Sequence, residues 1–233
     1  MPESVPILLV PGLNCSPRLY ARQMPALWRF GPVTVADHTR DDTMAAIARR
    51  ILAAAPPRFA LAGLSMGGYI ALEIVRQAAE RVEKLALLDT GARADTPEAT
   101  AKRHANIALA QSGRFEDVID PQFPLYVHPA RANDAALKAD YLAMCRDVGP
   151  GAYVRQQKAI MNRIDSRPLL ATIRVPTLVL VGEQDAATPP ALSDEMAAAI
   201  PGARLVKVAE CGHLSTMEQP ETVTGELVAW MSA

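Results

Sequence analysis

Short apolar runs recur along the chain, and amphipathic stretches separate the early ones. Six runs have the length of a β-strand: Val5–Val10, Val33–Asp37, Phe59–Leu64, Lys84–Asp89, Thr177–Gly182 and Ala203–Ala209. Apolar runs without polar alternation are typical of strands that are buried on both faces. The stretches between the early runs have helical periodicity, at Pro17–Leu27, Thr43–Ala54 and Met66–Ala79. This pattern predicts a parallel sheet with helices packed on both faces.

The alternation of strands and helices stops between Arg93 and Arg167. This segment has no convincing strand and carries helix-like pieces at Thr96–Gln111, Ala130–Asp147 and Gly151–Asn162. It is too long for a loop inside a compact domain. We therefore expect a helical cap over residues 93–167, inserted into a core domain of residues 1–92 and 168–233. The alternation then resumes, with further helices predicted at Pro190–Ala199 and Pro220–Met231.

Composition and charge narrow the class of protein. The chain has 233 residues, enough for one α/β domain with an inserted subdomain. Its net charge of −1 implies no broad attraction to nucleic acid or to an anionic membrane. No apolar run approaches the roughly 20 residues of a membrane span, and the N-terminal run reads as a first strand and not a signal peptide. We expect the partner to be a small molecule.

The cysteines indicate the cellular compartment of the protein, and the short motifs indicate whether it binds a cofactor. Cys15, Cys145 and Cys211 are widely spaced and odd in number, so they form neither a disulfide framework nor a zinc pattern. A reduced, cytoplasmic protein is the simplest interpretation. The sequence also has no dinucleotide fingerprint, no phosphate-binding Walker motif and no cluster of metal ligands. We therefore expect no cofactor and no metal.

The strongest motif is Gly63-Leu64-Ser65-Met66-Gly67, which joins the third apolar run to a predicted helix. This G-x-S-x-G pattern between strand and helix is the nucleophile elbow, a sharp turn that exposes the serine hydroxyl. Gly63 and Gly67 suit a turn where a Cβ would clash with the crossing strand and helix. An ordinary serine helix cap would explain Ser65 but not the paired glycines. Ser65 is thus the candidate nucleophile.

A serine hydroxyl needs a base to remove its proton, and His213 is the best candidate. It follows the last predicted strand, and functional groups of parallel sheets gather beyond the carboxyl ends of strands. His38 also follows a strand but is expected further from the elbow. His104 and His128 fall in the predicted cap, where surface or hydrogen-bonded roles are expected.

The acid that orients the base has two main candidates, Asp185 and Asp89, which both lie between Ser65 and His213 in the chain. That order, nucleophile then acid then base, is the one expected for the hydrolase elbow. We favour Asp185, because its loop is expected beside the histidine loop and follows the Gly182 turn. Asp89 ends the fourth run and suits hydrogen bonds to loop amides, while Glu183 is a lesser alternative.

The negative charge of a tetrahedral intermediate requires two N–H donors. The Met66 N–H at the start of the helix is one, and the Leu13 N–H in the loop after the first strand is the expected second. Gly12, Asn14 and Leu214 are the expected substrate-binding residues. Cys15 as a thiol nucleophile is disfavoured, because no base is implied beside it.

Together these residues resemble the α/β-hydrolase fold family, specifically its small capped serine hydrolases. The resemblance covers nearly the whole chain and rests on PGLNC, GLSMGG, LVLVGEQDAATPP and AECGHLSTMEQPE. It implies the same roles for Ser65, Asp185, His213, Leu13 and Met66, and a six-stranded, mainly parallel sheet flanked by helices with an inserted helical cap. The family's strand order implies that all six strands run parallel. This chain has Pro11-Gly12 where the family usually has His-Gly, and the N-terminal hairpin is missing.

The function expected from these features is hydrolysis of a carboxylic ester with a small to medium acyl group, through an acyl-enzyme on Ser65. Lactones, thioesters, perhydrolysis and the cleavage of carbon–carbon bonds are alternatives that use the same triad. A non-catalytic ligand-binding protein on a hydrolase fold is the alternative from another class. An Arg or Lys of the cap would suit an acidic substrate, but the sequence places none of them in a pocket.

Overall fold

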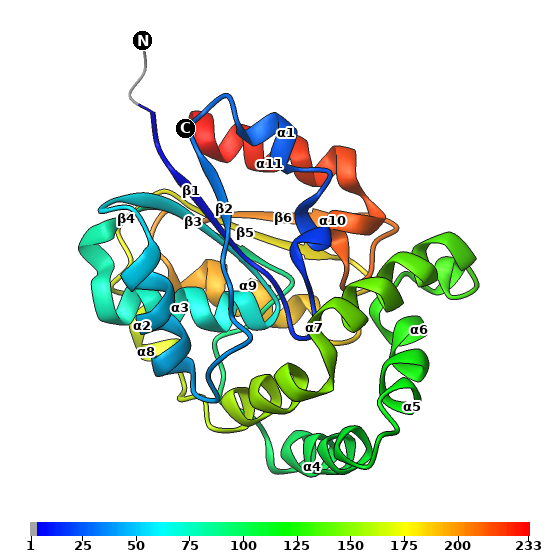
Figure 1. The fold of residues 1–233 in the computed structure, drawn as a ribbon. Coiled ribbons are helices and arrows are strands. Elements are labelled where there is room, and N and C mark those ends of the chain that lie inside the picture. Colours follow the sequence, from blue (N-terminus) through cyan, green and yellow to red (C-terminus); the bar gives the residue numbers. More distant parts are fainter. Residues whose placement is uncertain (1–3) are drawn as a thin grey trace.

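One sheet forms the centre of the molecule (Figure 1). The computed structural model describes residues 4–233, so that residues 1–3 of the predicted core segment lie outside the described residues. The six strands have the order β2-β1-β3-β4-β5-β6. Each of the neighbouring pairs is parallel, so the sheet is parallel throughout and not merely in its main part.

The strands occupy the six predicted runs with small shifts at their ends. Their bounds are β1 Ile7–Val10, β2 Val33–Val35, β3 Phe59–Leu64, β4 Val82–Leu88, β5 Thr177–Gly182 and β6 Arg204–Val208. The central strands β3 and β5 match the predicted bounds and are buried along their whole length. The edge strand β2 has only partly buried or exposed residues and is two residues shorter than its predicted run.

Helices cover both faces of the sheet, as predicted (Figure 1). Alternate side chains of β1 enter two different cores, Ile7 and Leu9 one of them, Leu8 and Val10 the other. One face carries η1 Pro17–Tyr20, α1 Met24–Leu27, α10 Ser215–Glu218 and α11 Pro220–Ser232; the other carries α2 Met44–Ala54, α3 Met66–Ala78, α8 Arg167–Leu170 and α9 Pro190–Ala199. A short turn of helix, η2 Ala79–Arg81, joins α3 to β4. The predicted helix Pro17–Leu27 is in fact two short pieces, η1 and α1.

A helical insertion, residues 93–167, lies between β4 and β5 and projects at the lower right of Figure 1. It contains α4 Pro97–Gln111, α5 Glu116–Ile119, η3 Asp120–Gln122, α6 Phe123–Tyr126, η4 Pro129–Arg131 and α7 Ala135–Met161. Two helices that were predicted separately form the two arms of α7, which bends at Gly149 (φ 76°) just before Pro150. Glycine tolerates this left-handed conformation, and the proline explains the break. Within residues 4–233, none of the helices combines the length and hydropathy that a membrane span requires.

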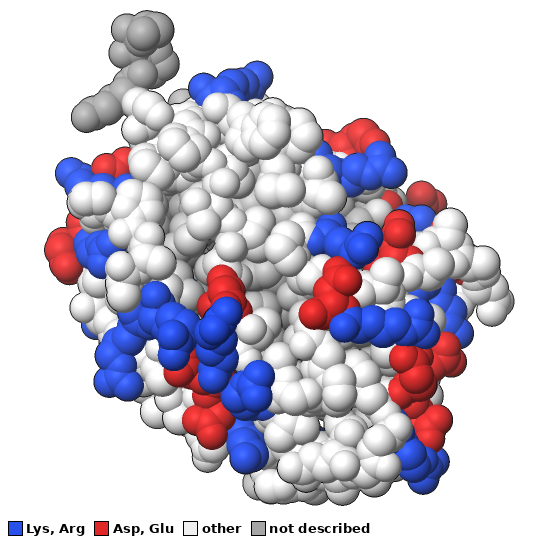
Figure 2. All heavy atoms as spheres, viewed as in Figure 1, with Lys and Arg blue, Asp and Glu red and all other residues white. Residues whose placement is uncertain are grey.

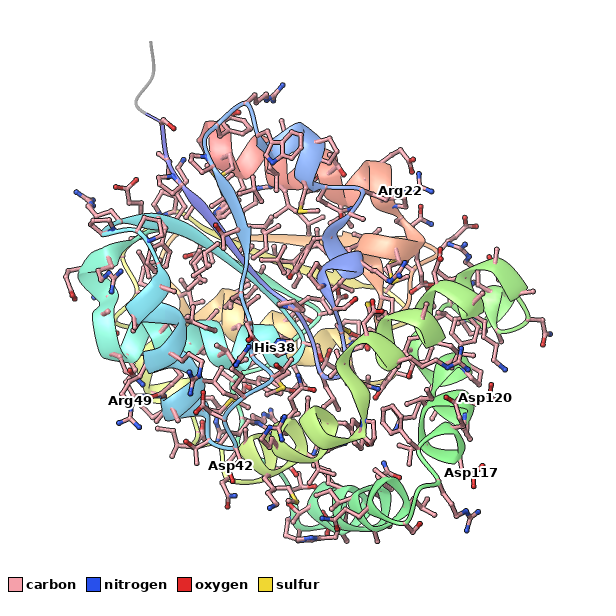
Figure 3. The ribbon with its side chains drawn as sticks, in the orientation of Figure 1. Arg22, His38, Asp42, Arg49, Asp117 and Asp120 are labelled. Atoms are coloured by element: carbon pink, nitrogen blue, oxygen red, sulfur yellow. The ribbon has the colours of Figure 1, made fainter. Side chains whose placement is uncertain are left out.

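Charged side chains are mixed over the face of the molecule shown in Figure 2. Basic side chains gather most densely over the region of α2, with acidic side chains among them. In α2 and the segment before it, Arg50 contacts Asp41 at 2.5 Å, and Arg40 contacts Asp37 at 2.8 Å. Figure 3 shows Arg49 on α2, and Asp117 and Asp120 on the insertion, at the periphery of the fold, whereas His38 lies among the strands and helices.

Candidate active site

Ser65 lies at the sharp turn between β3 and α3. Its backbone is in a left-handed, strained conformation (φ 55°, ψ −117°). Glycine is required on either side by close approach, because a Cβ on Gly63 would lie 2.2 Å from the carbonyl oxygen of Gly67. A Cβ on Gly67 would lie 2.0 Å from the carbonyl oxygen of Val10. The turn has the geometry of the nucleophile elbow that the motif predicts.

His213 follows β6 and lies against Ser65. Its Nε2 is 2.8 Å from Ser65 Oγ, and its Nδ1 is 2.8 Å from Asp185 Oδ2. The histidine loop is fixed to the insertion, because the N–H groups of His213 and Leu214 both donate to the carbonyl oxygen of Tyr126, at 3.0 and 3.1 Å. A carboxylate can only accept hydrogen bonds, so Nδ1 carries the proton and Nε2 is free to accept one from Ser65.

Asp185, in the loop after β5, is surrounded by donors. The N–H groups of Ala187 and Thr188 donate to Oδ1 at 2.8 and 2.9 Å, and the Thr188 hydroxyl donates to Oδ2 at 2.7 Å. Burial by itself raises the pKa of Asp185, but His213 and these hydrogen bonds outweigh burial and hold the pKa below its usual value. The side chain facing the imidazole is therefore an ionised carboxylate.

Asp89, the other predicted acid, is also buried but faces different partners. Its Oδ1 accepts from the Gly182 N–H at 2.9 Å, and its Oδ2 accepts from the Ser215 hydroxyl. Burial, followed by the negative charge of Asp185, raises the pKa of Asp89 well above its usual value. Asp89 thus ties the ends of β4 and β5 to the start of α10, and Asp185 is the carboxylate that contacts His213.

The loop after β1 borders the same cavity. Gly12 and Leu13 line the cavity beside Ser65, and the Cys15 N–H donates to the Gly12 carbonyl oxygen at 3.1 Å to close the turn. Among residues 4–233, no protein acceptor receives the N–H of Leu13 or of Met66. These two N–H groups are the ones predicted to stabilise a developing oxyanion, and they are free to do so.

Asn14 does not take the substrate-binding place predicted for it. Its side chain does not line the cavity, and its Oδ1 and Nδ2 are buried without a protein partner among residues 4–233. Its backbone adopts a left-handed conformation (φ 59°), and its N–H donates to Gln156 Oε1 at 2.9 Å. The turn directs this residue into the protein because its N–H is bound by α7, a long-range contact that the local sequence does not encode.

The other candidates from the sequence make no hydrogen bond to the Ser65 hydroxyl. His38 is buried with Nε2 2.9 Å from the Gly12 carbonyl oxygen, and burial lowers its pKa. His104 and Glu183 are exposed, and His128 accepts a hydrogen bond from the Ala130 N–H at 3.2 Å. Cys15 lines the cavity, but burial raises the pKa of its thiol well above the usual value, which disfavours a thiolate.

The cavity beside Ser65 encloses roughly 550 Å³, part of it open to solvent. Of the predicted substrate-binding residues, Gly12 and Leu214 line it. The remaining wall was not predicted, and much of it comes from the helical insertion and from α3: Tyr69, Arg103, Tyr126, Tyr141 and Ile160. Tyr69 lies on α3, one turn after Ser65. No sequence signal marks the other four residues, because their place in the wall depends on how the insertion folds back over the sheet. Residues 4–233 hold no group of three or more His, Cys, Asp or Glu side chains placed to bind a metal.

Comparisons with known proteins identify a family and similar structures. Residues 7–226 match the model of the alpha/beta hydrolase family. A putative carbamate hydrolase of Azorhizobium caulinodans is 31% identical over 210 residues, which cover 86% of this chain and 74% of that protein.

Two solved structures are also similar to this chain. One is a thermophilic esterase of Thermogutta terrifontis, with a TM-score of 0.89 and 29% identity over 98% of this chain and 89% of that one. The other is the enol-lactonase of Burkholderia xenovorans, with a TM-score of 0.87 and 25% identity over 99% of this chain and 92% of that one. With its elbow, its parallel sheet and a family match over almost its whole length, the chain belongs to the alpha/beta hydrolase family.

Proposed function

We propose that this protein is a serine hydrolase that cleaves carboxylic esters through an acyl-enzyme on Ser65. The observation that carries the proposal is the unbroken hydrogen-bonded series from Ser65 Oγ to His213 Nε2 and from His213 Nδ1 to Asp185 Oδ2, with 2.8 Å at each step. A nucleophile, a base and an orienting acid in this arrangement are what acyl transfer requires.

The first half of the reaction forms the acyl-enzyme. Ser65 Oγ attacks the ester carbonyl carbon while His213 Nε2 takes the hydroxyl proton, and Asp185 stabilises the imidazolium that results. The carbonyl oxygen becomes an oxyanion that accepts from the Leu13 and Met66 N–H groups. His213 then gives its proton to the leaving alkoxide as the bond from the carbonyl carbon to that oxygen breaks.

The second half releases the acid. Water attacks the acyl carbon and gives a proton to His213, and the same two N–H groups bind the second oxyanion. Collapse of this intermediate breaks the bond to Ser65 Oγ, which recovers its proton from His213. Removing one such N–H donor costs roughly 2.7–4 kcal/mol in related chemistry.

The helical insertion, residues 93–167, acts in this proposal as a cap. It supplies Tyr126 and Tyr141 to the cavity wall, and the carbonyl oxygen of Tyr126 holds the histidine loop. A partly open cavity with apolar and aromatic side chains in its wall suits small to medium acyl groups. Likeness to an esterase and to an enol-lactonase supports esters first and lactones as the alternative.

A fluorophosphonate probe and a short-chain aryl ester test the proposal. We expect the wild-type protein to react covalently with the probe and to hydrolyse the ester, and Ser65→Ala to do neither. Ser193→Ala is the matched control, because Ser193 is also buried and its hydroxyl has no protein partner in residues 4–233. A folded wild-type protein that neither labels nor turns over the ester would instead indicate a ligand-binding protein.

A further inference from the structure

Arg103 is the one side chain of permanent charge among the residues that line the cavity beside Ser65. It projects from α4 of the insertion, and its side chain is 21% exposed. Its Nε donates to Asp95 Oδ2 at 3.1 Å, and its Nη1 donates to Gln157 Oε1 at 2.8 Å. No protein acceptor among residues 4–233 receives a hydrogen bond from Nη2, so this donor is unused.

The two residues that bind the Arg103 guanidinium are themselves held by hydrogen bonds. Gln157 is buried, and its own Nε2 donates to the Tyr153 hydroxyl at 2.6 Å. Asp95 also accepts from the Thr100 hydroxyl at 2.9 Å. The partners of Nε and Nη1 are themselves held by hydrogen bonds, so the Arg103 side chain is already ordered. It therefore loses little further conformational entropy when Nη2 binds a ligand.

Positive charge exceeds negative charge in the cluster of side chains around Arg103. Asp95, whose side chain is 3% exposed, also accepts from Arg163 Nη1 at 2.8 Å, and the side chain of Arg163 is only 12% exposed. Arg163 stacks on the ring of Tyr69, with its Cζ 4.4 Å from the ring centroid, and Tyr69 lines the cavity. Two guanidinium groups therefore share one carboxylate, which leaves one positive charge in a partly buried cluster at the cavity wall.

The N–H donors of an arginine with a purely structural role normally bond to protein acceptors. A buried positive charge without an anion nearby destabilises the protein. The unused donor and the excess charge both lie at the wall of the cavity that holds Ser65. A carboxylate on the bound substrate would satisfy both, because guanidinium and carboxylate match in shape and charge.

We propose that Arg103 binds a carboxylate of the substrate, so that the preferred substrates are esters or lactones whose acyl part carries a second, free carboxylate. This inference rests on the proposed function of Ser65. The ester carbonyl lies at Ser65, and an apolar spacer beside Ile160 and the tyrosines of the wall separates it from the carboxylate at Arg103. Arg103 is in this sense a specificity-determining residue that takes no part in bond cleavage.

The test compares charged and neutral esters. The substrates are the monomethyl esters of succinate, glutarate and adipate, each paired with the isosteric neutral ester in which an isopropyl group replaces the free carboxylate. We expect the wild-type protein to show a higher kcat/KM for the best half-ester than for its neutral partner. Arg103→Gln should reduce this preference roughly 10- to 100-fold, chiefly through the KM of the half-ester.

Two further variants sharpen the comparison. Arg146→Gln is the control, because Arg146 also belongs to the insertion but its guanidinium pairs at the surface with Glu116, at 2.8 Å; it should keep the wild-type preference. Arg103→Lys keeps the charge without the planar fork and should retain part of the preference. If Arg103→Gln fails to fold, the role of Arg103 is tested by two results: the wild-type preference for half-esters and its partial loss in Arg103→Lys.

A binding measurement separates this inference from the proposed function. Calorimetry of glutarate with Ser65→Ala protein should detect binding that weakens at least 10-fold when Arg103→Gln is added. Such binding, together with a wild-type protein that hydrolyses no ester, would support the carboxylate site and overturn the hydrolase proposal. Active protein that prefers the neutral esters, or keeps its preference for half-esters in Arg103→Gln, would overturn the role of Arg103.

Discussion

Gln156 and Asn14 are 142 positions apart in the chain and are joined by a hydrogen bond, in which the Asn14 N–H donates to Gln156 Oε1 at 2.9 Å. The bond links α7 of the insertion to the loop after β1. His38 supports the same loop from the other side, with Nε2 2.9 Å from the Gly12 carbonyl oxygen. The peptide that carries the Leu13 N–H is thus held between the insertion and the sheet.

Replacing Gln156 tests whether this bond positions the oxyanion donor. Gln156→Leu leaves the Asn14 N–H buried without its acceptor, a loss worth about 1–3 kcal/mol. If the loop then shifts, the Leu13 N–H stabilises the oxyanion of the transition state less well. In that case kcat should drop roughly 5- to 100-fold with little change in KM. Steady-state kinetics and the melting temperature are measured together. A lower melting temperature with unchanged kcat would show that the bond serves stability alone.

The two buried aspartates should differ sharply when each is changed to asparagine. Asp185→Asn takes the carboxylate from His213 Nδ1 and should lower kcat by roughly 10³- to 10⁴-fold, as loss of the orienting acid does in related triads. Asp89→Asn should stay within about 10-fold of wild type, because burial already favours the neutral form of Asp89. Ester hydrolysis and the melting temperature of both variants are the measurements. The opposite ranking in kcat would reassign the acid to Asp89.

Activity should fall on the acidic side as His213 becomes protonated. Burial by itself lowers the pKa of His213, but the charge and hydrogen bond of Asp185 outweigh burial and raise the pKa above 6.5. Only neutral His213 accepts the proton of Ser65, so kcat/KM should decline as the pH falls through this raised value.

The same reasoning fixes the direction of change in a variant. In Asp185→Asn the principal cause of the raised pKa of His213 is removed, so the acidic limb of its residual activity should move to lower pH. Profiles of kcat/KM from about pH 5 to pH 9 for both proteins provide the comparison. A limb that moves to higher pH, or that does not move, would contradict the assigned source of the shift.

Two glycine-to-alanine changes should affect stability in opposite directions. Gly67→Ala places a Cβ 2.0 Å from the Val10 carbonyl oxygen and should destabilise the fold by about 3 kcal/mol or more. Gly225→Ala is the control: Gly225 is exposed within α11, and a Cβ there meets nothing within 4 Å. It should stabilise the protein by about 1 kcal/mol. Denaturant unfolding measures both, and equal midpoints for Gly67→Ala and wild type would refute the steric argument.

Much of the core could be predicted because its signals are local. The runs that became β3 and β5 are apolar throughout, since both faces of these strands are covered, and their predicted bounds are those observed. The edge strand β2 and its neighbour β1 are each two residues shorter than their predicted runs. The junction near Gly149 was predicted as a break between two helices, whereas the chain bends there within α7.

The elbow at Ser65 and the loop positions of His213 and of two candidate acids could be predicted, because a G-x-S-x-G turn and strand-end loops are encoded by neighbouring residues. That Asp185 and not Asp89 faces the imidazole follows from the fold, since the two aspartates come after adjacent strands and differ in their distant partners. The fold also turned Asn14 away from the cavity and brought Arg103 into its wall. Those placements depend on how the helices of the insertion pack against loops far away in the chain, and no local pattern of residues specifies such contacts.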